Sequence, residues 1–201
     1  MKSKVLCVSV VTILSVGIWL TVGQQTANAQ ARHVRWDIIF FAPVGSGFGF
    51  FPGGTLSATA SDNVSQISLT GTGTFVQPAS GKGTSNAVTG GGTWATNGPG
   101  PRASGTYTVE GFVQYAFADG TLAGSGLVDG IGDIRDTHAG LAIFSILYSD
   151  GERGTLVISC NLGPQTPAIV YEGAHATKGF VDYFAPVLPA DPDATMFHFA
   201  D

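Results

Sequence analysis

The chain has 201 residues, of which only 11% are charged, and its formal net charge at pH 7 is −5. An acidic chain lacks the basic surface that nucleic acid or an anionic membrane surface attracts, so neither is expected as a partner. The two cysteines are Cys7, in an N-terminal apolar segment, and Cys160. We therefore expect no internal disulfide once that segment is removed.

Residues 1–29 have the pattern of an export signal. Two lysines flank the start of an apolar run over 5–23, and the polar, alanine-rich QQTANAQA follows. These features fit a bacterial-type signal peptide cleaved after Ala29 or Ala31. An uncleaved anchor is the alternative, because the run is long enough to cross a bilayer. We expect a secreted or periplasmic protein with a single β domain over 30–201 and no membrane span after cleavage.

Short runs with a two-residue apolar period follow, separated by glycine-rich turns. This period places successive side chains on opposite faces of a strand. The Asp150-Gly151 pair between two apolar runs predicts a tight hairpin. The run at 138–149 is apolar on both faces; a helix is the alternative there, and the hairpin partner favours a strand. Cys160 shares the apolar face of its run, which predicts a buried thiol. The expected strands lie at 33–42, 54–61, 66–76, 87–96, 104–118, 138–149 and 153–162.

These patterns predict an all-β protein. We expect an antiparallel meander of about 8–10 strands that is closed, or partly closed, into a barrel, because closure removes exposed strand edges. A two-sheet sandwich is the alternative. Glycine within the expected strands is typical of bulges or of the sharp bending that a barrel needs.

A short motif of glycine, threonine and an aromatic residue recurs within 66–118, as GTGTF at 71–75, GGGTW at 90–94 and SGTYT at 104–108. These strands resemble those of secreted bacterial barrels related to allene oxide cyclase and plant dirigent proteins. The sequences YSDGERGTLVISC and EGAHATKGFVDYF are similar to stretches of uncharacterised secreted bacterial proteins. The resemblance implies a barrel, and it matches no catalytic residue of the cyclases to a position in this chain.

Four ionisable side chains gather in VYEGAHATKGFVDYF at 170–184. They are Glu172, His175, Lys178 and Asp182. A strand with one bend places His175 on one face and the other three on the opposite face; a helix, the alternative, would pair Glu172 with His175. His175 and Glu172 are therefore the candidate acid/base residues. In a strand, His175 needs a partner from another strand, such as Glu110 or Asp37.

The stretch PVGSGFGFFPGG at 43–54 places Phe48, Phe50 and Phe51 in an expected loop. Loops normally face water, so three phenyl rings in a loop are expected to pack against other apolar groups. They would form a plug over the core or the barrel mouth. Alternatively, they would form a mobile apolar lid over a ligand, or a protein contact.

The sequence DGIGDIRDTH at 129–138 brings Asp129, Asp133 and Asp136 into one loop. Calcium prefers such oxygen-rich loops, so these carboxylates are the metal candidates. The spacing of an EF-hand is absent, and a solvated loop balanced by Arg135 is the favoured interpretation. No histidine spacing typical of zinc and no phosphate-binding or nucleophile motif occurs, so no cofactor is expected.

Three functions remain. The first is non-enzymatic binding of a small apolar ligand in the barrel cavity or mouth, gated by 43–54. The second is a structural or interaction module of the envelope or extracellular space, which would form a homo-oligomer or bind an envelope protein through that loop or the run at 138–148. The third is a cyclase- or isomerase-like enzyme with His175 or Glu172 as acid/base.

Overall fold

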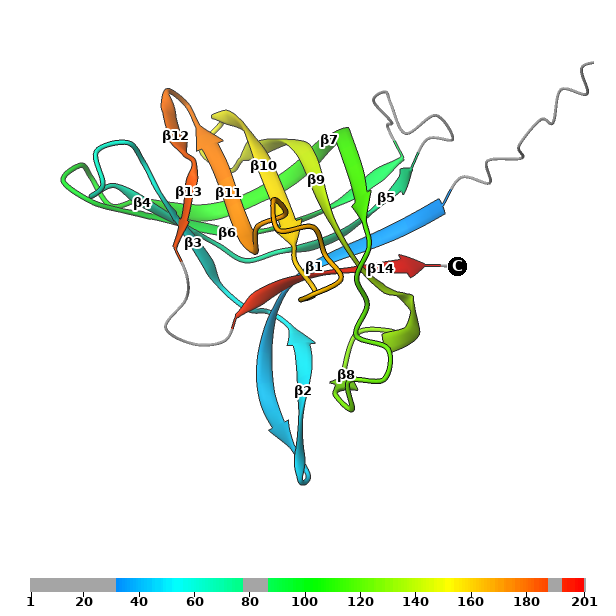
Figure 1. Ribbon diagram of the computed structural model, residues 1–201. Coiled ribbons are helices and arrows are strands. Elements are labelled where there is room, and N and C mark those ends of the chain that lie inside the picture. The colour runs from blue at the N-terminus through cyan, green and yellow to red at the C-terminus, as the bar shows by residue number, and fades with distance from the viewer. Residues whose placement is uncertain (1–31, 78–86, 188–192, 201) are drawn as a thin grey trace, which may run out of the picture.

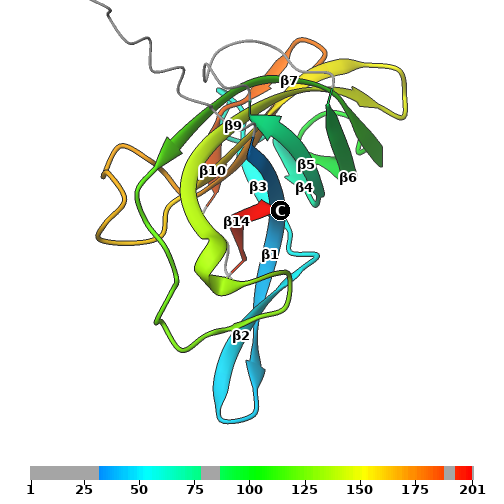
Figure 2. The same ribbon diagram turned by 90° about the vertical axis from the view of Figure 1, so that its right-hand side faces the viewer.

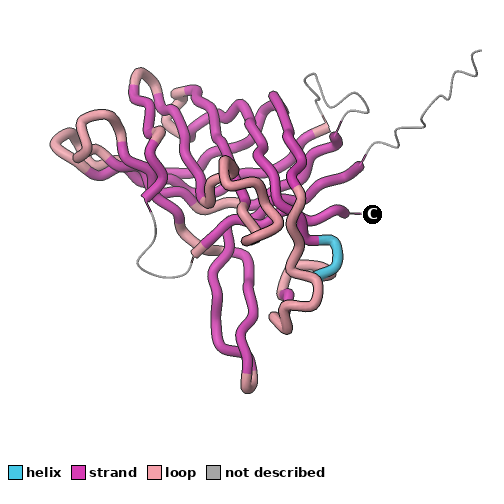
Figure 3. Tube along the Cα trace, in the orientation of Figure 1, coloured by secondary structure: helices cyan, strands magenta, loops and turns pink. Residues whose placement is uncertain are grey.

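The computed structural model describes residues 32–77, 87–187 and 193–200 (Figure 1). The predicted export signal at 1–29 lies outside these ranges. Within them the chain forms strands and one short 3₁₀ helix, η1 (Ile134–Asp136), as Figure 3 shows. No helix in the described ranges is long and apolar enough to cross a membrane.

The strands are β1 (Arg32–Val44), β2 (Gly47–Pro52), β3 (Leu56–Thr59), β4 (Gln66–Leu69), β5 (Thr72–Gln77), β6 (Val88–Asn97), β7 (Ser104–Ala118), β8 (Val128–Asp129), β9 (Thr137–Tyr148), β10 (Arg153–Cys160), β11 (Gly173–Lys178), β12 (Val181–Tyr183), β13 (Ala185–Val187) and β14 (Ala194–Ala200). Most predicted runs are confirmed as strands, including the central strand β9 and its hairpin with β10. The strands outnumber the expected 8–10 for two reasons: the run at 66–76 breaks into β4 and β5, and several strands are very short.

Six strands close into an antiparallel barrel, which confirms the predicted class. β1 pairs with β14, β14 with β9, β9 with β7, β7 with β6, β6 with β5, and β5 again with β1. The remaining strands extend this ring outward. β10, β11 and β12 continue from β9, while β4, β3 and β13 continue from β6. β2 forms a hairpin with β1 that projects away from the barrel (Figure 1).

The barrel interior is packed with aromatic side chains. Trp36 lies 5.4 Å from Phe144 between ring centroids, and Phe75 stacks on Phe112 at 4.8 Å. Gly73 of β5 and Gly90 of β6 make room for the indole, because a Cβ built on them would lie 2.7 Å and 3.0 Å from atoms of the Trp36 ring. These glycines of the recurrent motif are thus explained by the close approach of a large ring to the sheet.

β7 is the longest strand, and it bends around the barrel (Figure 2). Its register with β9 shifts between Val109 and Gly111 and again between Phe112 and Gln114. Each shift is an irregularity of the β-bulge type, which increases local bending and twist. The two shifts keep aromatic residues of β7 on the inner face as far as the end of the strand, where the candidate site lies.

Candidate functional site

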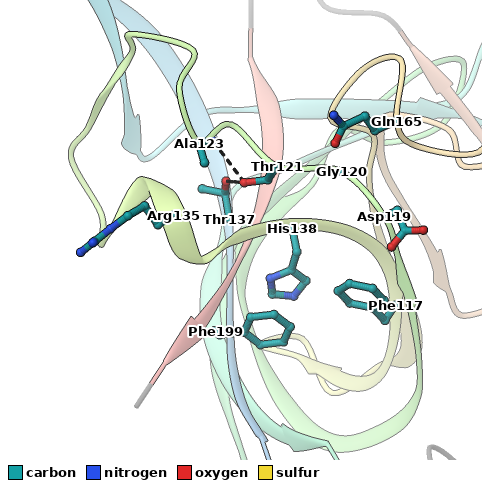
Figure 4. Close-up of a pocket in the computed structure, with 10 residues that line it drawn as sticks. All are labelled: Phe117, Asp119, Gly120, Thr121, Ala123, Arg135, Thr137, His138, Gln165 and Phe199. Atoms are coloured by element: carbon teal, nitrogen blue, oxygen red, sulfur yellow. Dashed lines mark hydrogen bonds between the residues drawn. The ribbon is translucent and has the colours of Figure 1, made fainter.

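One end of the barrel is formed by the starts of β1, β6 and β9 and by the ends of β5, β7 and β14. We call this end the barrel mouth and define it by three rings: Phe117 of β7, His138 of β9 and Phe199 of β14. An open depression of about 700 Å³ lies over these rings (Figure 4). Its lining consists of Phe117, Asp119, Gly120, Thr121, Ala123, Arg135, Thr137, His138, Gln165 and Phe199.

The three rings of the mouth form a stacked platform. His138 and Phe199 lie 3.9 Å apart between centroids and within 12° of parallel. Phe117 stacks on Phe199 at 6.0 Å and on His138 at 5.7 Å. The Phe117 side chain remains 49% exposed, and the guanidinium of Arg32 lies 4.8 Å from the centroid of Phe199. The mouth therefore offers flat apolar surface to a molecule that enters the depression.

His138 is a neutral base with an unused acceptor. Its Nδ1 lies 3.1 Å from the carbonyl oxygen of Asp136. A carbonyl only accepts hydrogen bonds, so Nδ1 carries the proton. Burial lowers the pKa of His138 to about 4, which leaves the ring neutral at pH 7. Nε2 then presents a lone pair, and this buried atom has no hydrogen-bond partner among the described residues.

A second unsatisfied polar atom belongs to a ring that contacts His138. The ring of Tyr115 meets that of His138 edge-on, with centroids 6.1 Å apart. Its buried hydroxyl also has no partner within the described ranges. Burial raises the pKa of Tyr115 well above its usual range, so the hydroxyl stays protonated. Leaving a buried polar atom unpaired costs about 1–3 kcal/mol.

The wall of the depression is held by hydrogen bonds around Thr137. Its hydroxyl donates to the carbonyl of Ile134 and accepts from the backbone N–H of Leu122, each at 2.8 Å. The hydroxyl of Thr121 lies 3.3 Å from it (Figure 4). These contacts fix the segment 119–136 against the start of β9, so the depression has a shaped wall.

The predicted polar strand at 170–184 forms, with β11 and β12 separated by a turn at 179–180. Glu172 lies at its start. One carboxylate oxygen accepts from the backbone N–H and the hydroxyl of Thr195, and the other accepts from the N–H of Asn161. Burial raises the pKa of Glu172. The carboxylate therefore ties β14 to the end of β10.

His175 lies apart from this carboxylate. Its Nδ1 lies 3.2 Å from the carbonyl oxygen of Phe184 and 3.4 Å from the hydroxyl of Tyr171. Burial lowers its pKa. The expected partners are engaged elsewhere among the described side chains: Glu110 pairs with an arginine of β10, and Asp37 pairs with an arginine of β1. Neither His175 nor Glu172 lines the depression.

The remaining two charges of this stretch also separate. Lys178 binds Asp150 and Glu152, and its ammonium lies 4.4 Å from the ring centroid of Trp94. Asp182 is exposed and pairs in register with Thr177 on the neighbouring strand. The four groups thus serve different local contacts and do not form one catalytic cluster.

The expected loop at 43–54 is largely strand, which corrects the prediction. The end of β1 and the whole of β2 form a hairpin in which Phe40 faces Phe51 and Phe41 faces Phe50. Phe50 is fully buried, Phe51 is half-buried, and Phe48 near the turn is 56% exposed. None of the three predicted residues lines the depression. On its other edge β2 pairs with β8, and a role of the hairpin as a lid or protein contact stays a prediction.

The three predicted calcium carboxylates point to three different contacts. Asp129 binds His198, with 2.7 Å between Oδ2 and Nε2. Asp133 pairs with Arg135, as the solvated-loop interpretation expects. Asp136 contributes its backbone carbonyl to His138. Across the described ranges, no three histidine, cysteine or acidic residues are grouped in a way that could hold a metal ion.

The predicted buried thiol is confirmed. Cys160 is fully buried, and its Sγ lies 3.2 Å from the carbonyl oxygen of Thr195. Burial raises its pKa well above the usual range. The group is a protonated structural thiol, because a reactive cysteine needs the thiolate.

Comparison of the chain with protein-family models, with curated proteins and with solved structures gives no match in any of the three. The resemblance to barrels of the allene oxide cyclase and dirigent type therefore stays a prediction. What the mouth can bind follows from its own geometry.

Proposed function

We propose that the protein binds a small, largely apolar ligand at the barrel mouth without covalent chemistry, and that it acts outside the cytoplasm after removal of residues 1–29. The observation that carries the binding proposal is the depression of about 700 Å³ over the stacked rings of Phe117, His138 and Phe199. Its size lies within the range of small-molecule sites. The apolar run and cleavage pattern near the start of the chain support export.

The mouth is favoured over the barrel interior as the binding place. Phe75, Phe112 and Phe144 contact one another inside the barrel with centroid distances of 4.8–6.3 Å. Protein interiors packed in this way leave few voids larger than a water molecule. A ligand therefore gains its apolar contact at the end of the ring stack, where Phe117 still faces water.

The test uses a neutral apolar dye such as Nile red, together with a panel of fatty acids and small aromatic molecules. Binding is measured as a thermal shift and by titration of the purified protein. We expect at least one class to stabilise the protein, and Phe117→Ala to weaken that binding about tenfold, since truncation removes a principal stacking surface. The matched control is Phe180→Ala, because Phe180 is fully exposed on a turn and does not line the depression. A panel without any thermal shift, or equal loss in both variants, contradicts the proposal.

A second candidate function is association through the hairpin of β1 and β2. No ionisable residue occurs between Asp37 and Asp62, and Phe40 and Phe48 on this hairpin are 37% and 56% exposed. An uncharged, projecting apolar surface is typical of a contact site. Light scattering across a concentration series tests it: Phe48→Ser should lower the apparent mass, while a wild-type protein that is monomeric throughout contradicts this candidate.

A further inference from the structure

We infer that the hairpin of β1 and β2, together with the segment 120–128 beside it, docks on a lipid bilayer without net charge, and that the tip of the hairpin inserts into the bilayer interface. This inference goes beyond ligand binding at the mouth and does not depend on it. It rests on two uncharged segments that meet in the fold, on exposed apolar side chains on both faces of the hairpin, and on the projection of the hairpin from the barrel.

Two segments without charge meet on this side of the molecule. Residues 38–61 contain no ionisable side chain, and neither do residues 120–128. The parallel pairing of β2 with β8 brings them together, with Gly49 opposite Val128, and Val128 is 44% exposed. The carboxylate of Asp129, which follows, is only 4% exposed. A surface free of charge loses little hydration energy when it enters a lipid interface.

Apolar side chains are exposed on both faces of the hairpin. Phe40 pairs in register with Phe51, and Pro43 pairs with Phe48. Because consecutive residues of a strand alternate between its faces, Phe40 and Phe48 belong to opposite faces. They are 37% and 56% exposed. A protein docked on one face would leave the other face in water, whereas a bilayer surrounds the tip and covers both faces.

The edges of the hairpin disfavour a protein strand as the partner. Beyond Ile39, no described strand pairs with the edge of β1 that lies away from β2. Pro43 lies in this stretch and has no N–H to donate to an added strand. Proline on an edge is one of the devices that prevent strand addition. The other edge, formed by β2, is already paired with β8.

The projection of the hairpin allows its tip to reach a bilayer ahead of the barrel. The hairpin extends from one side of the barrel, with the β8 segment next to it (Figures 1 and 2). Its strands pair in register from Ile39 with Pro52 to Val44 with Gly47, so the backbone between them is hydrogen-bonded. Unpaired backbone groups are costly in hydrocarbon. The free edge of β1 therefore limits insertion to the tip around Phe48.

The experiment measures co-sedimentation with phosphatidylcholine vesicles. The protein is purified after removal of residues 1–29, because the apolar run over 5–23 would itself bind lipid. Wild type should bind at low and at high salt, and Phe48→Ser should weaken partitioning about tenfold, because the variant no longer buries a phenyl ring in the interface. Phe180→Ser is the matched control, because Phe180 is a fully exposed phenylalanine on the turn between β11 and β12 and should not affect binding.

The lipid headgroup provides a further arm of this experiment. The chain is acidic, with a formal net charge of −5. Replacing part of the phosphatidylcholine by phosphatidylglycerol should therefore weaken binding at low salt, and added salt should restore it. Binding that requires the anionic lipid contradicts docking through an uncharged surface.

A tryptophan at the tip gives a second readout. Trp36 and Trp94 are buried, so the additional emission of Phe48→Trp reports the environment of the tip. Vesicles should shift this emission to shorter wavelength, and brominated acyl chains should quench it, whereas the additional emission of Phe180→Trp should not change.

Three further results overturn the inference. They are no binding of the wild-type protein to phosphatidylcholine, an equal loss in the two serine variants, and self-association through Phe48 in light scattering with the vesicles left unbound. None of them bears on the dye and fatty-acid panel with Phe117→Ala, which decides ligand binding at the mouth separately.

Discussion

Two buried histidines lie one position apart on the paired strands β9 and β14 and have opposite surroundings. His138 pairs in register with Phe197, and His198 pairs with Thr137, so the two rings lie on opposite faces of the sheet. Their exposed fractions are only 2% and 3%. His198 faces outward and binds a buried carboxylate, whereas His138 faces the ring stack and has only a backbone carbonyl.

The difference separates a structural histidine from a candidate binding histidine. Asp129, the partner of His198, also accepts the backbone N–H groups of Ile131 and Gly132. It thereby fastens the segment 119–136 to the outside of the barrel. His198 also leaves one ring nitrogen unpaired among the described residues, but Gly132 and Phe50 cover that ring, and it does not line the depression. Of the two histidines, His138 lines the depression and His198 does not.

The largest expected effect on the free energy of unfolding concerns the structural histidine, His198, and its partner Asp129. Asp129→Ala removes the partner of His198 and the acceptor of two backbone donors, and should lower the free energy of unfolding by about 4 kcal/mol. Urea denaturation measures it. Asp133→Ala is the matched control in the same segment, because its pair with Arg135 is exposed and screened by water and should cost far less. Similar losses in the two variants would show that His198 is not held in the way we describe.

The next largest effect concerns the pH dependence of His138. Its pKa is about 4 in the folded protein and 6.5 in the unfolded chain, so the unfolded chain binds the proton first as the pH falls. Stability from this group is therefore fully present above pH 6.5 and is lost between about pH 6.5 and 4, by up to about 3 kcal/mol. Desolvation is the main cause, and Arg32 and His198 add to it.

The measurement is the difference in unfolding free energy between wild type and His138→Phe at several pH values. The difference isolates His138 from Glu172, whose raised pKa acts in the opposite direction: its contribution is present at low pH and is lost as the pH rises. A constant difference across this range would mean that His138 is not buried as a neutral base.

The sequence predicts the barrel but not this pair of histidines. The two-residue period locates β7, because one of its faces lies in the core, and the Asp150-Gly151 turn identifies β9 by its hairpin with β10. The placement of β14 between β1 and β9 is a long-range pairing that no local pattern encodes. His138 and Phe199 come together only through that pairing. The one available signal was a histidine at the start of a run that is otherwise apolar.

Local patterns are also limited at the other predicted sites. The hairpin at 43–54 reads as a loop because glycine and proline weaken the strand pattern, although cross-strand phenylalanine pairs stabilise it. The cluster around Glu172 and His175 is dense in sequence, and strand geometry and the turn at 179–180 disperse it, as the strand interpretation predicts. Local charge density in a strand therefore says little about which side chains meet.

A smaller effect on stability is expected for Thr137, which adjoins both histidines. Thr137 lies opposite His198 in the sheet, directly before His138. Thr137→Val keeps the shape of the side chain but leaves the backbone N–H of Leu122 without its acceptor, which should cost about 1–2 kcal/mol. Thr121→Val is the control, because the contact of Thr121 with Thr137 is long, at 3.3 Å. Affinity for a ligand of the dye and fatty-acid panel should fall more in the first variant, since the wall of the depression loosens. Unchanged affinity in a folded Thr137→Val protein would show that the segment 119–136 does not shape the site.

The smallest expected effect on stability belongs to Phe117, the residue on which the proposed binding depends most. The phenyl ring of Phe117 is already half exposed, so Phe117→Ala should lower the free energy of unfolding by less than about 1 kcal/mol, well below the cost of truncating a fully buried phenylalanine. Phe75→Ala, in the packed interior, should cost about 3–5 kcal/mol and serves as the reference. If the mouth is a binding surface, Phe117→Ala weakens the ligand with little loss of stability. A ring that only completed the core would show the reverse, a large loss of stability without a change in affinity, because a structural ring contributes mainly to folding and a ligand platform mainly to the complex.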